Sequence, residues 1–195
     1  MLEASEGTAL HAYIVLALLI GARTEELRAL HWSEVDLVGR PDATPLEPPS
    51  ISVLRSVRVG GDTKTRKSRR RLAMPHRCVV ALILRRELLN RMPAGDELVF
   101  ATANGTQLDA HNVRRSFRKI IDSAGLDAGQ WTPREMRHSF VSLLSDSGMR
   151  IEDISRLVGH SGTATTERGL PPADPAGARR RRGRDGRDLP EPGRR

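Results

Sequence analysis

Residues 132–140 read Thr-Pro-Arg-Glu-Met-Arg-His-Ser-Phe and mark the start of a helix. Thr132 is a typical cap residue, Pro133 suits the first helical position, and Glu135 completes a capping-box pattern. The helix is expected to bury the apolar residues Met136, Phe140, Leu143 and Leu144, and to stop at Gly148. A helix that begins so clearly and buries one face indicates a folded, largely helical domain.

Further helices and a small sheet are predicted on the N-terminal side of this stretch. The run Ala9–Leu19 is nearly all apolar, which suits a buried helix that ends at Gly21. Other helices are expected from a Thr24 cap to Leu30, from Pro75 to about Asn90, from an Asp109 cap to Gly125, and over 151–158. Alternating apolar residues predict a strand over 51–59, a turn at 60–62, a returning strand over 69–74 and a short strand over 98–101. The expected fold class is α+β, mainly helical, with a small antiparallel sheet.

The overall composition favours a polyanionic partner. The 195 residues include 32 basic and 24 acidic side chains, a net charge of +8. Cys78 is the single cysteine, so an intramolecular disulfide and a thiolate metal cluster are both excluded, and its apolar neighbours predict a buried, inert thiol. The longest apolar stretch, Ala12–Ala22, is shorter than the roughly 20 residues that span a membrane. With an acidic N-terminus that resembles no signal peptide, the chain is expected to be cytoplasmic and to have no membrane partner.

The composition changes after Glu167. Residues 168–195 hold nine Arg, four acidic residues, five Pro and five Gly, and their only bulky apolar residues are Leu170 and Leu189. Such a segment cannot bury enough surface to offset its ordering entropy, so it is expected to be a disordered tail. The predicted globular domain therefore covers 1–167.

Basic residues recur at the predicted element boundaries. Arg23 follows a Gly-Ala bend before a short helix, and Lys64 lies at the tip of the predicted hairpin. Arg134 and Arg137 share one helix face, and His160 follows the predicted end of the last helix. Taken singly, each has an ordinary explanation: a solvated or carboxylate-paired arginine, a solvent-exposed lysine, and a histidine that caps a helix.

Taken together and in order, these segments resemble the boxes of the tyrosine recombinases, or phage integrases. They are Gly-Ala-Arg23-Thr-Glu-Glu26-Leu, Thr-Lys64-Thr-Arg-Lys-Ser-Arg, Thr-Pro-Arg134-Glu-Met-Arg137-His-Ser-Phe and Leu-Val-Gly159-His160. The resemblance covers residues 1 to about 167. It implies the catalytic domain of this family, and because the sequence starts at the first catalytic-domain helix, the separate N-terminal DNA-gripping domain of relatives is expected to be missing.

The resemblance also implies a reaction and a set of roles. A tyrosine attacks the scissile phosphate of double-stranded DNA, a 3′-phosphotyrosine forms, and the 5′-hydroxyl leaves, with no metal or other cofactor. Arg23 and Arg137 would stabilise the charge on the pentavalent transition state, because guanidinium groups are planar and permanently charged. Lys64 would be the general acid and His160 would donate to a non-bridging oxygen. Arg66 and Lys67 of the hairpin would contact DNA.

Two positions depart from the family pattern. The residue three before Arg137 is usually a histidine, and here it is Arg134, which cannot take up a proton at neutral pH. Arg134 is then only a phosphate ligand, or proton removal takes place elsewhere. The family's tyrosine lies about ten residues after the position of His160, where this chain has none. The single tyrosine, Tyr13, falls within the first apolar helix and is expected to be core packing.

The sequence therefore predicts the catalytic domain of a site-specific DNA recombinase without its nucleophile. The alternatives are a DNA-binding module with no catalysis and a non-functional integrase remnant. Active relatives work as tetramers held by an exchanged C-terminal segment, and the altered tail argues against that exchange here.

One hypothesis for the tail from Arg168 is a one-base shift of the reading frame, with which the sequence is compatible. Codons that encode Arg168–Ala176 can read, one base later, Ala-Val-Tyr-Arg-Gln-Gln-Ile-Arg, and this Tyr falls ten residues after His160. A genuine alternative terminus is the rival explanation.

Overall fold

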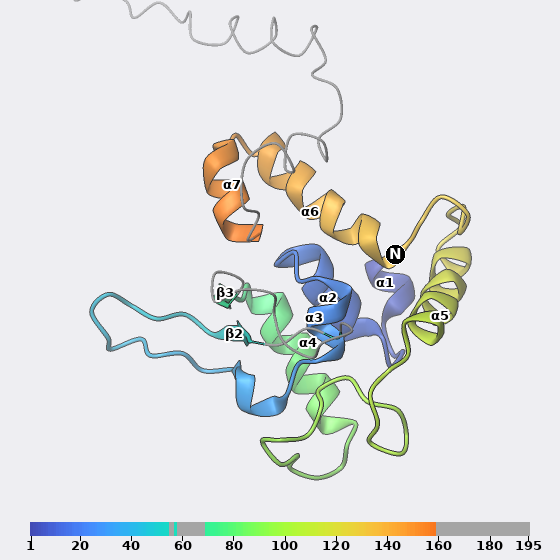
Figure 1. Ribbon diagram of the computed structural model, residues 1–195, viewed down its shortest axis with the longest axis horizontal. Coiled ribbons are helices and arrows are strands. Elements are labelled where there is room, and N and C mark those ends of the chain that lie inside the picture. Colours follow the sequence, from blue (N-terminus) through green and yellow to red (C-terminus); the bar gives the residue numbers. More distant parts are fainter. Residues whose placement is uncertain (55–56, 58–68, 159–195) are drawn as a thin grey trace, which may run out of the picture.

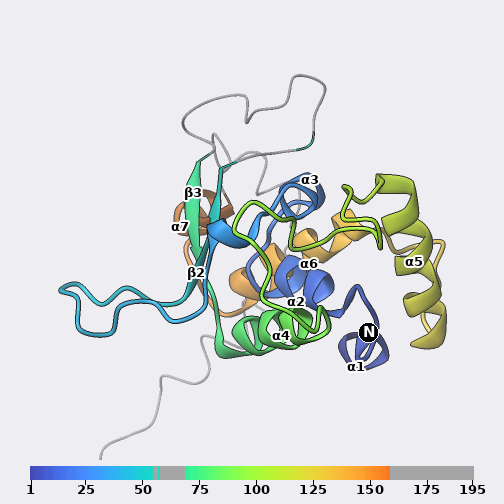
Figure 2. The same ribbon diagram turned by 90° about the horizontal axis from the view of Figure 1, so that it is seen from below.

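The computed structural model of the chain describes residues 1–54, 57 and 69–158. Its helices are α1 (Leu2–Ser5), α2 (His11–Leu19), α3 (Thr24–Arg28), α4 (His76–Glu87), α5 (Ala110–Ser123), α6 (Pro133–Asp146) and α7 (Ile151–Val158). A single 3-10 turn covers Trp32–Glu34 within these residues. Three antiparallel strands form a sheet in the order β1 (Val35–Asp36), β2 (Ser50–Val53) and β3 (Arg70–Ala73). The sheet lies on one side of the molecule and α5 on the other (Figures 1 and 2).

Helix α2 is the centre of the core and lies between α4 and α6 (Figure 1). Its sequence is apolar on every side, which is the pattern of a helix surrounded by other elements, and Ile14, Val15 and Leu16 are fully buried. Tyr13 is also buried, packs edge-to-face on Phe100 with ring centroids 5.2 Å apart, and donates a hydrogen bond to the carbonyl of Thr24. The prediction that Tyr13 is core packing is therefore confirmed.

The chain leaves α2 through Gly21, which lies directly against α6. Its φ of +62° belongs to the left-handed region, and a Cβ atom at this position would lie 2.3 Å from Cδ1 of Phe140. Only glycine satisfies both conditions. The contact sets how closely α6 approaches the segment that leads into α3.

The predicted hairpin strands are present in a shorter form. Ile51 of β2 pairs with Leu72 of β3, and Ile51, Val53 and Leu72 are buried. The expected strand over 51–59 ends at Val53, and the expected turn at 60–62 lies outside the described residues. The strand expected over 98–101 is wrong, because Leu98 and Ala101 make only isolated bridges to His31 and Gln107. Strand β1 was not predicted, since two residues are too few to show an alternating pattern.

Most predicted helices are confirmed, with local corrections. Asp109 caps α5 by accepting from the backbone N–H groups of His111 and Asn112, and α7 has the predicted bounds. Thr24 is not a cap but the first residue of α3, because Arg23 takes the cap position. Thr132 is at the cap of α6 but accepts no side-chain hydrogen bond, so the expected capping box does not form.

The apolar face of α6 also differs from the prediction at one residue. Met136, Phe140 and Val141 are buried, whereas Leu143 is 58% exposed. Phe140 and Val141 pack against α7 through Ile154 and Val158, and Leu143 lies outside this contact. Among the helices of the described residues, none has the length and apolar content that crossing a membrane requires.

Candidate phosphate-binding site

Arg137 connects three parts of the fold at the end of α2. Its guanidinium donates hydrogen bonds to the carbonyl of Gly21, after α2, and to the carbonyl of Val158, at the end of α7. Burial, followed by the like charge of Arg23, lowers the pKa of Arg137 to about 9, so the group remains charged at neutral pH. One partly buried cation thus holds the Gly21 segment and the end of α7 together.

Arg23 reaches the same place from α3. It follows Gly21 by two residues and takes the extended backbone conformation of a helix cap, with φ −74° and ψ 151°. Its charge acts on Arg137 strongly enough to lower the pKa of that residue. Because Arg137 also bonds the carbonyl of Gly21, two residues before Arg23, the structure brings together the two arginines to which the family resemblance assigns the transition-state charge.

A buried carboxylate holds Arg23 in position. Glu26 is 5% exposed and accepts from the backbone N–H of Arg23 at 2.8 Å and from its Nη1 at 2.8 Å. Arg70 of β3 donates to both oxygens of the same carboxylate, with two N···O distances of 2.9 Å. Burial alone would raise the pKa of Glu26, but the hydrogen bonds and charges of Arg70 and Arg23 lower it to about 2.

The site carries a net positive charge. Arg23, Arg70 and Arg137 supply three positive charges against one negative charge on Glu26, a net charge of +2 for these four side chains. Groups of this kind can bind a phosphate dianion, because a guanidinium offers paired N–H donors that match phosphate oxygens. Arg70 was not predicted as a site residue.

The remaining predicted site residues are either exposed or outside the described part of the chain. Arg134 is exposed at the start of α6, whereas Arg137, three residues later, is turned into the fold. Lys64, Arg66, Lys67 and His160 lie outside the described residues, as does the predicted tail over 168–195. The segment that contains Lys64 lies between β2 and β3, and the residue before Gly159 is Val158, whose carbonyl Arg137 binds.

A second group of basic side chains lies on α5 and was missed from the sequence. Arg114, Arg115, Arg118 and Lys119 are exposed, on the opposite side of the helix from the buried Val113, Phe117, Ile120 and Ile121. The signal was present, since basic residues recur between the apolar positions that predicted the helix. The start of α5 is tied to α3, because Arg28 donates a hydrogen bond to the carbonyl of Leu108.

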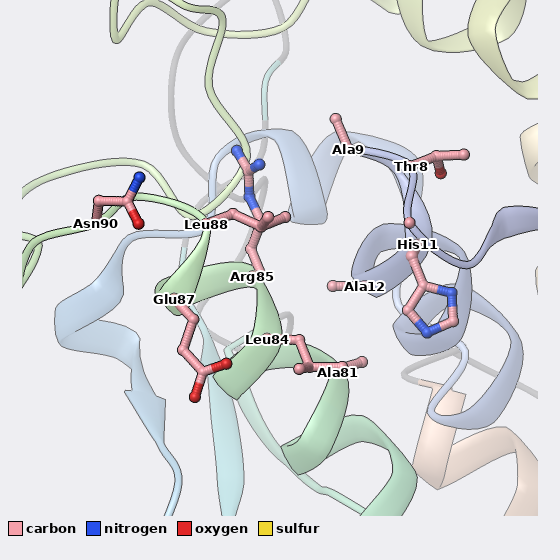
Figure 3. Close-up of a pocket in the computed structure, with 11 residues that line it drawn as sticks. Thr8, Ala9, His11, Ala12, Ala81, Leu84, Arg85, Glu87, Leu88 and Asn90 are labelled. Carbon is pink, nitrogen blue, oxygen red and sulfur yellow. The ribbon is translucent and has the colours of Figure 1, made fainter.

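Other features of the described residues do not form a competing site. Over 1–54, 57 and 69–158, no group of three or more His, Cys, Asp or Glu side chains could hold a metal ion. A cavity of about 360 Å³ lies between residues 7–12 and α4 with the residues that follow it (Figure 3). Its lining includes apolar Ala9, Ala12, Ala81, Leu84 and Leu88 and polar His11, Arg85, Glu87 and Asn90. Cys78 is buried, as predicted, and burial raises the pKa of its thiol to about 12.

The chain is similar to known proteins over most of its length. Residues 1–169 match the phage integrase family. An integrase from Streptomyces ambofaciens is 62% identical over 175 residues, covering 86% of this chain and 45% of that protein. A XerC-like tyrosine recombinase from Caldanaerobacter subterraneus subsp. tengcongensis is 24% identical over 180 residues, covering 84% of this chain and 46% of that protein. The chain thus spans about half the length of these curated relatives.

Solved structures show the same fold. The crystal structure of XerA recombinase matches with a TM-score of 0.71 and 25% identity, covering 96% of this chain and 60% of that one. The Tn1549 transposon integrase, in complex with transposon right end DNA, matches with a TM-score of 0.74 and 21% identity, covering 94% of this chain and 62% of that one. The predicted mainly helical fold with a small antiparallel sheet is confirmed.

Proposed function

Because the chain belongs to the phage integrase family, we propose that it is the catalytic part of a site-specific DNA recombinase, whose candidate phosphate-binding site holds the scissile phosphate of duplex DNA. The observation that carries this proposal is the convergence of Arg23 and Arg137 at the end of α2. The chemistry of these positively charged side chains suits an anion.

The proposed roles follow from the chemistry of phosphoryl transfer. The transition state carries additional negative charge on the non-bridging oxygens, and fixed guanidinium groups lower its energy without having to reorganise. Arg23 and Arg137 are the proposed ligands of these oxygens. Lys64 as general acid, His160 as a further donor and Arg134 as a phosphate ligand complete the proposal, with Arg66 and Lys67 contacting the DNA backbone.

The chain is further proposed not to cleave DNA strands, because a suitable tyrosine nucleophile is missing from its sequence. The single tyrosine in the sequence, Tyr13, is 1% exposed and its hydroxyl is bonded to the carbonyl of Thr24. It cannot reach a phosphate without unfolding α2. The same observation favours a second candidate function, a DNA-binding module that occupies sites without cutting them.

Binding to a fluorescently labelled duplex tests the first part of the proposal. Wild-type binding with little sequence preference is expected at roughly 10⁻⁴ to 10⁻⁶ M at physiological salt. Arg23→Gln should weaken it about tenfold, because a charged hydrogen-bond donor to phosphate is removed. The control is Arg40→Gln, an exposed arginine that pairs with Glu47 in the loop between β1 and β2. Equal affinities for wild type and Arg23→Gln would contradict the proposal that Arg23 binds a DNA phosphate.

Covalent capture distinguishes a recombinase from a binding module. A nicked suicide duplex loses its short cleaved piece, so that an attacking enzyme stays attached and is seen as a shifted band on a denaturing gel. No covalent band is expected from residues 1–195, while duplex binding is retained. A covalent band would show that another group acts as nucleophile. Thermal unfolding distinguishes both of these from a non-functional remnant, which would show no cooperative melting transition.

The coding DNA tests the origin of the missing tyrosine. If a one-base shift produced the sequence after Glu167, the codon of Leu170 must be CTA or TTA, since only these yield Tyr in the shifted frame. Restoring the frame should then restore covalent capture. Any other codon at Leu170 ends this explanation.

A further inference from the structure

Arg70 makes the strongest contact to the buried carboxylate of the phosphate-binding site, although no motif marks it. Its two terminal nitrogens bond both oxygens of Glu26 at 2.9 Å, and the two side chains are 11% and 4% exposed. The next residue, Arg71, extends from the other face of β3, is 50% exposed and pairs with Asp36 and Glu47. Two adjacent arginines on one strand thus have different surroundings, and only one belongs to the site.

The carboxylate presents an electrostatic difficulty to a site that binds phosphate. Glu26 bonds directly to the guanidinium of Arg23, and a buried charge is screened far less than an exposed one. With Arg23 as its sole partner, the carboxylate would neutralise the arginine that should hold the phosphate. The net charge of Arg23, Arg137 and Glu26 would then be +1.

We propose that Arg70 is a positioning residue that balances the charge of Glu26, so that the site retains two net positive charges for a phosphate. The inference rests on the proposed function, because it assumes that Arg23 and Arg137 bind the anion. Glu26 then orients Arg23 through two hydrogen bonds without cancelling its charge. Arg70 acts through Glu26 and does not itself touch the DNA.

The geometry explains why an arginine occupies this position. Oε1 of Glu26 accepts from Nη1 of both Arg23 and Arg70, and Oε2 accepts from the backbone of Arg23 and from Nη2 of Arg70. The planar fork of Arg70 therefore fixes the plane of the carboxylate, and the carboxylate fixes Arg23. A lysine would keep the charge but could not bond both oxygens in the same plane.

Lowering the pH distinguishes a charge-balancing role of Arg70 from a role in packing alone. The charged groups that face Glu26 in the described part of the chain are Arg23 of α3, Arg70 of β3 and Arg137 of α6. In the wild type, Glu26 stays ionised until about pH 2. Without Arg70, burial remains while the main stabilising partner is lost, so the pKa of Glu26 should rise above its ordinary value of 4.5. The carboxylate would then lose its charge in mild acid and release Arg23.

Sulfate binding to the full chain provides the test, because sulfate stays a dianion over the relevant range. Affinity is measured from about pH 6 to about pH 4 by following the Arg23 and Arg137 side-chain N–H signals by NMR. Arg70→Leu should bind about tenfold more weakly than wild type at the higher pH and should recover affinity as the pH falls. The wild-type profile supplies the baseline for histidine protonation, and Arg71→Leu is the matched control and should follow it.

Two more variants keep the test decisive if Arg70→Leu unfolds. Removing the ion pair as a unit, with Glu26→Gln and Arg70→Leu together, restores the net charge to +2 and should bring sulfate affinity back near wild type without the rise in acid. Arg70→Lys should likewise retain most of the affinity. Thermal melts of all variants establish that they are folded.

The outcomes distinguish this inference from the proposed function. If Arg23→Gln binds sulfate as wild type does, the proposed phosphate site itself is wrong. If Arg23→Gln weakens binding while Arg70→Leu matches wild type at every pH, the charge-balancing role of Arg70 is overturned. A double variant as weak as Arg70→Leu would also overturn it, because Arg70 would then act by direct binding or by packing alone.

Discussion

Gly21 supports the site through its backbone, since it has no side chain to contribute. Its carbonyl accepts from Arg137, its left-handed φ turns the chain toward Arg23, and its missing Cβ admits the ring of Phe140. These three functions meet in one residue because the end of α2 lies under α6. A change here should therefore affect stability and phosphate binding together.

Gly21→Ala should destabilise the fold by about 3 kcal/mol or more, because the new methyl group meets the Phe140 ring in addition to the cost of a left-handed φ. Gly125→Ala is the matched control, since Gly125 has a φ of +70° but nothing within 4 Å of an added Cβ, and should lose only about 1 kcal/mol. Urea denaturation of both variants measures the difference. Equal losses would show that the Phe140 contact is soft.

The depressed pKa of Glu26 predicts a specific acid sensitivity. A carboxyl whose pKa falls from 4.5 to about 2 on folding stabilises the protein above pH 4.5, and this contribution is lost as the pH falls through 2. Glu26→Gln should therefore be less stable than wild type by about 3 kcal/mol at neutral pH, with the gap closing in acid. Denaturation curves at several pH values check this. A gap that is independent of pH would mean that the carboxylate charge does not stabilise the fold.

At the scale of single elements, α5 is the clearest candidate for a further DNA contact. Its exposed side carries Arg114, Arg115, Arg118 and Lys119, and its start is joined to α3 through Arg28. Side chains of this kind bind phosphate oxygens of the DNA backbone and release counterions.

Replacing Arg114 and Arg118 by Gln should flatten the dependence of log affinity on log salt by about 2, roughly one for each phosphate contact. The control is Arg91→Gln, because Arg91 is paired with Glu97 in the loop after α4. Binding of a labelled duplex over a series of salt concentrations measures both slopes. An unchanged slope in the double variant would place α5 away from the DNA.

The elements also show what could be predicted from the sequence. Helices α5, α6 and α7 were predictable because each combines a regular apolar spacing with a clear end signal such as Asp109, Pro133 or Gly148. Strand β1 and the wrong strand over 98–101 were not, because such short segments pair according to their neighbours rather than their own pattern.

The site residues were predicted from the family resemblance and not from local sequence patterns. Arg23 and Arg137 are 114 residues apart in the sequence, and only the family resemblance joined them in advance. The partner of Glu26 could not be found in that way, because Arg70 lies 44 residues away within three consecutive arginines that look alike in the sequence. The two faces of β3, which separate Arg70 from Arg71, appear only once the strand is paired.

At the scale of the whole molecule, the charge is divided unevenly along the chain. The net charge is +8, and residues 168–195 contribute nine arginines against four acidic residues. Removing this segment after Glu167 should lower duplex affinity and flatten the salt dependence, since fewer counterions are released. If the truncated protein has the same melting temperature as the full chain, the predicted end of the globular domain at residue 167 is supported. An identical salt slope with and without the segment would contradict a DNA-binding contribution from the tail.

The most direct test of the account is a crystal structure of the chain bound to a short duplex. One backbone phosphate is expected within hydrogen-bond distance of both Arg23 and Arg137, with Glu26 still held by Arg70 and making no contact with the DNA. A duplex that binds without placing any phosphate between Arg23 and Arg137 would contradict it.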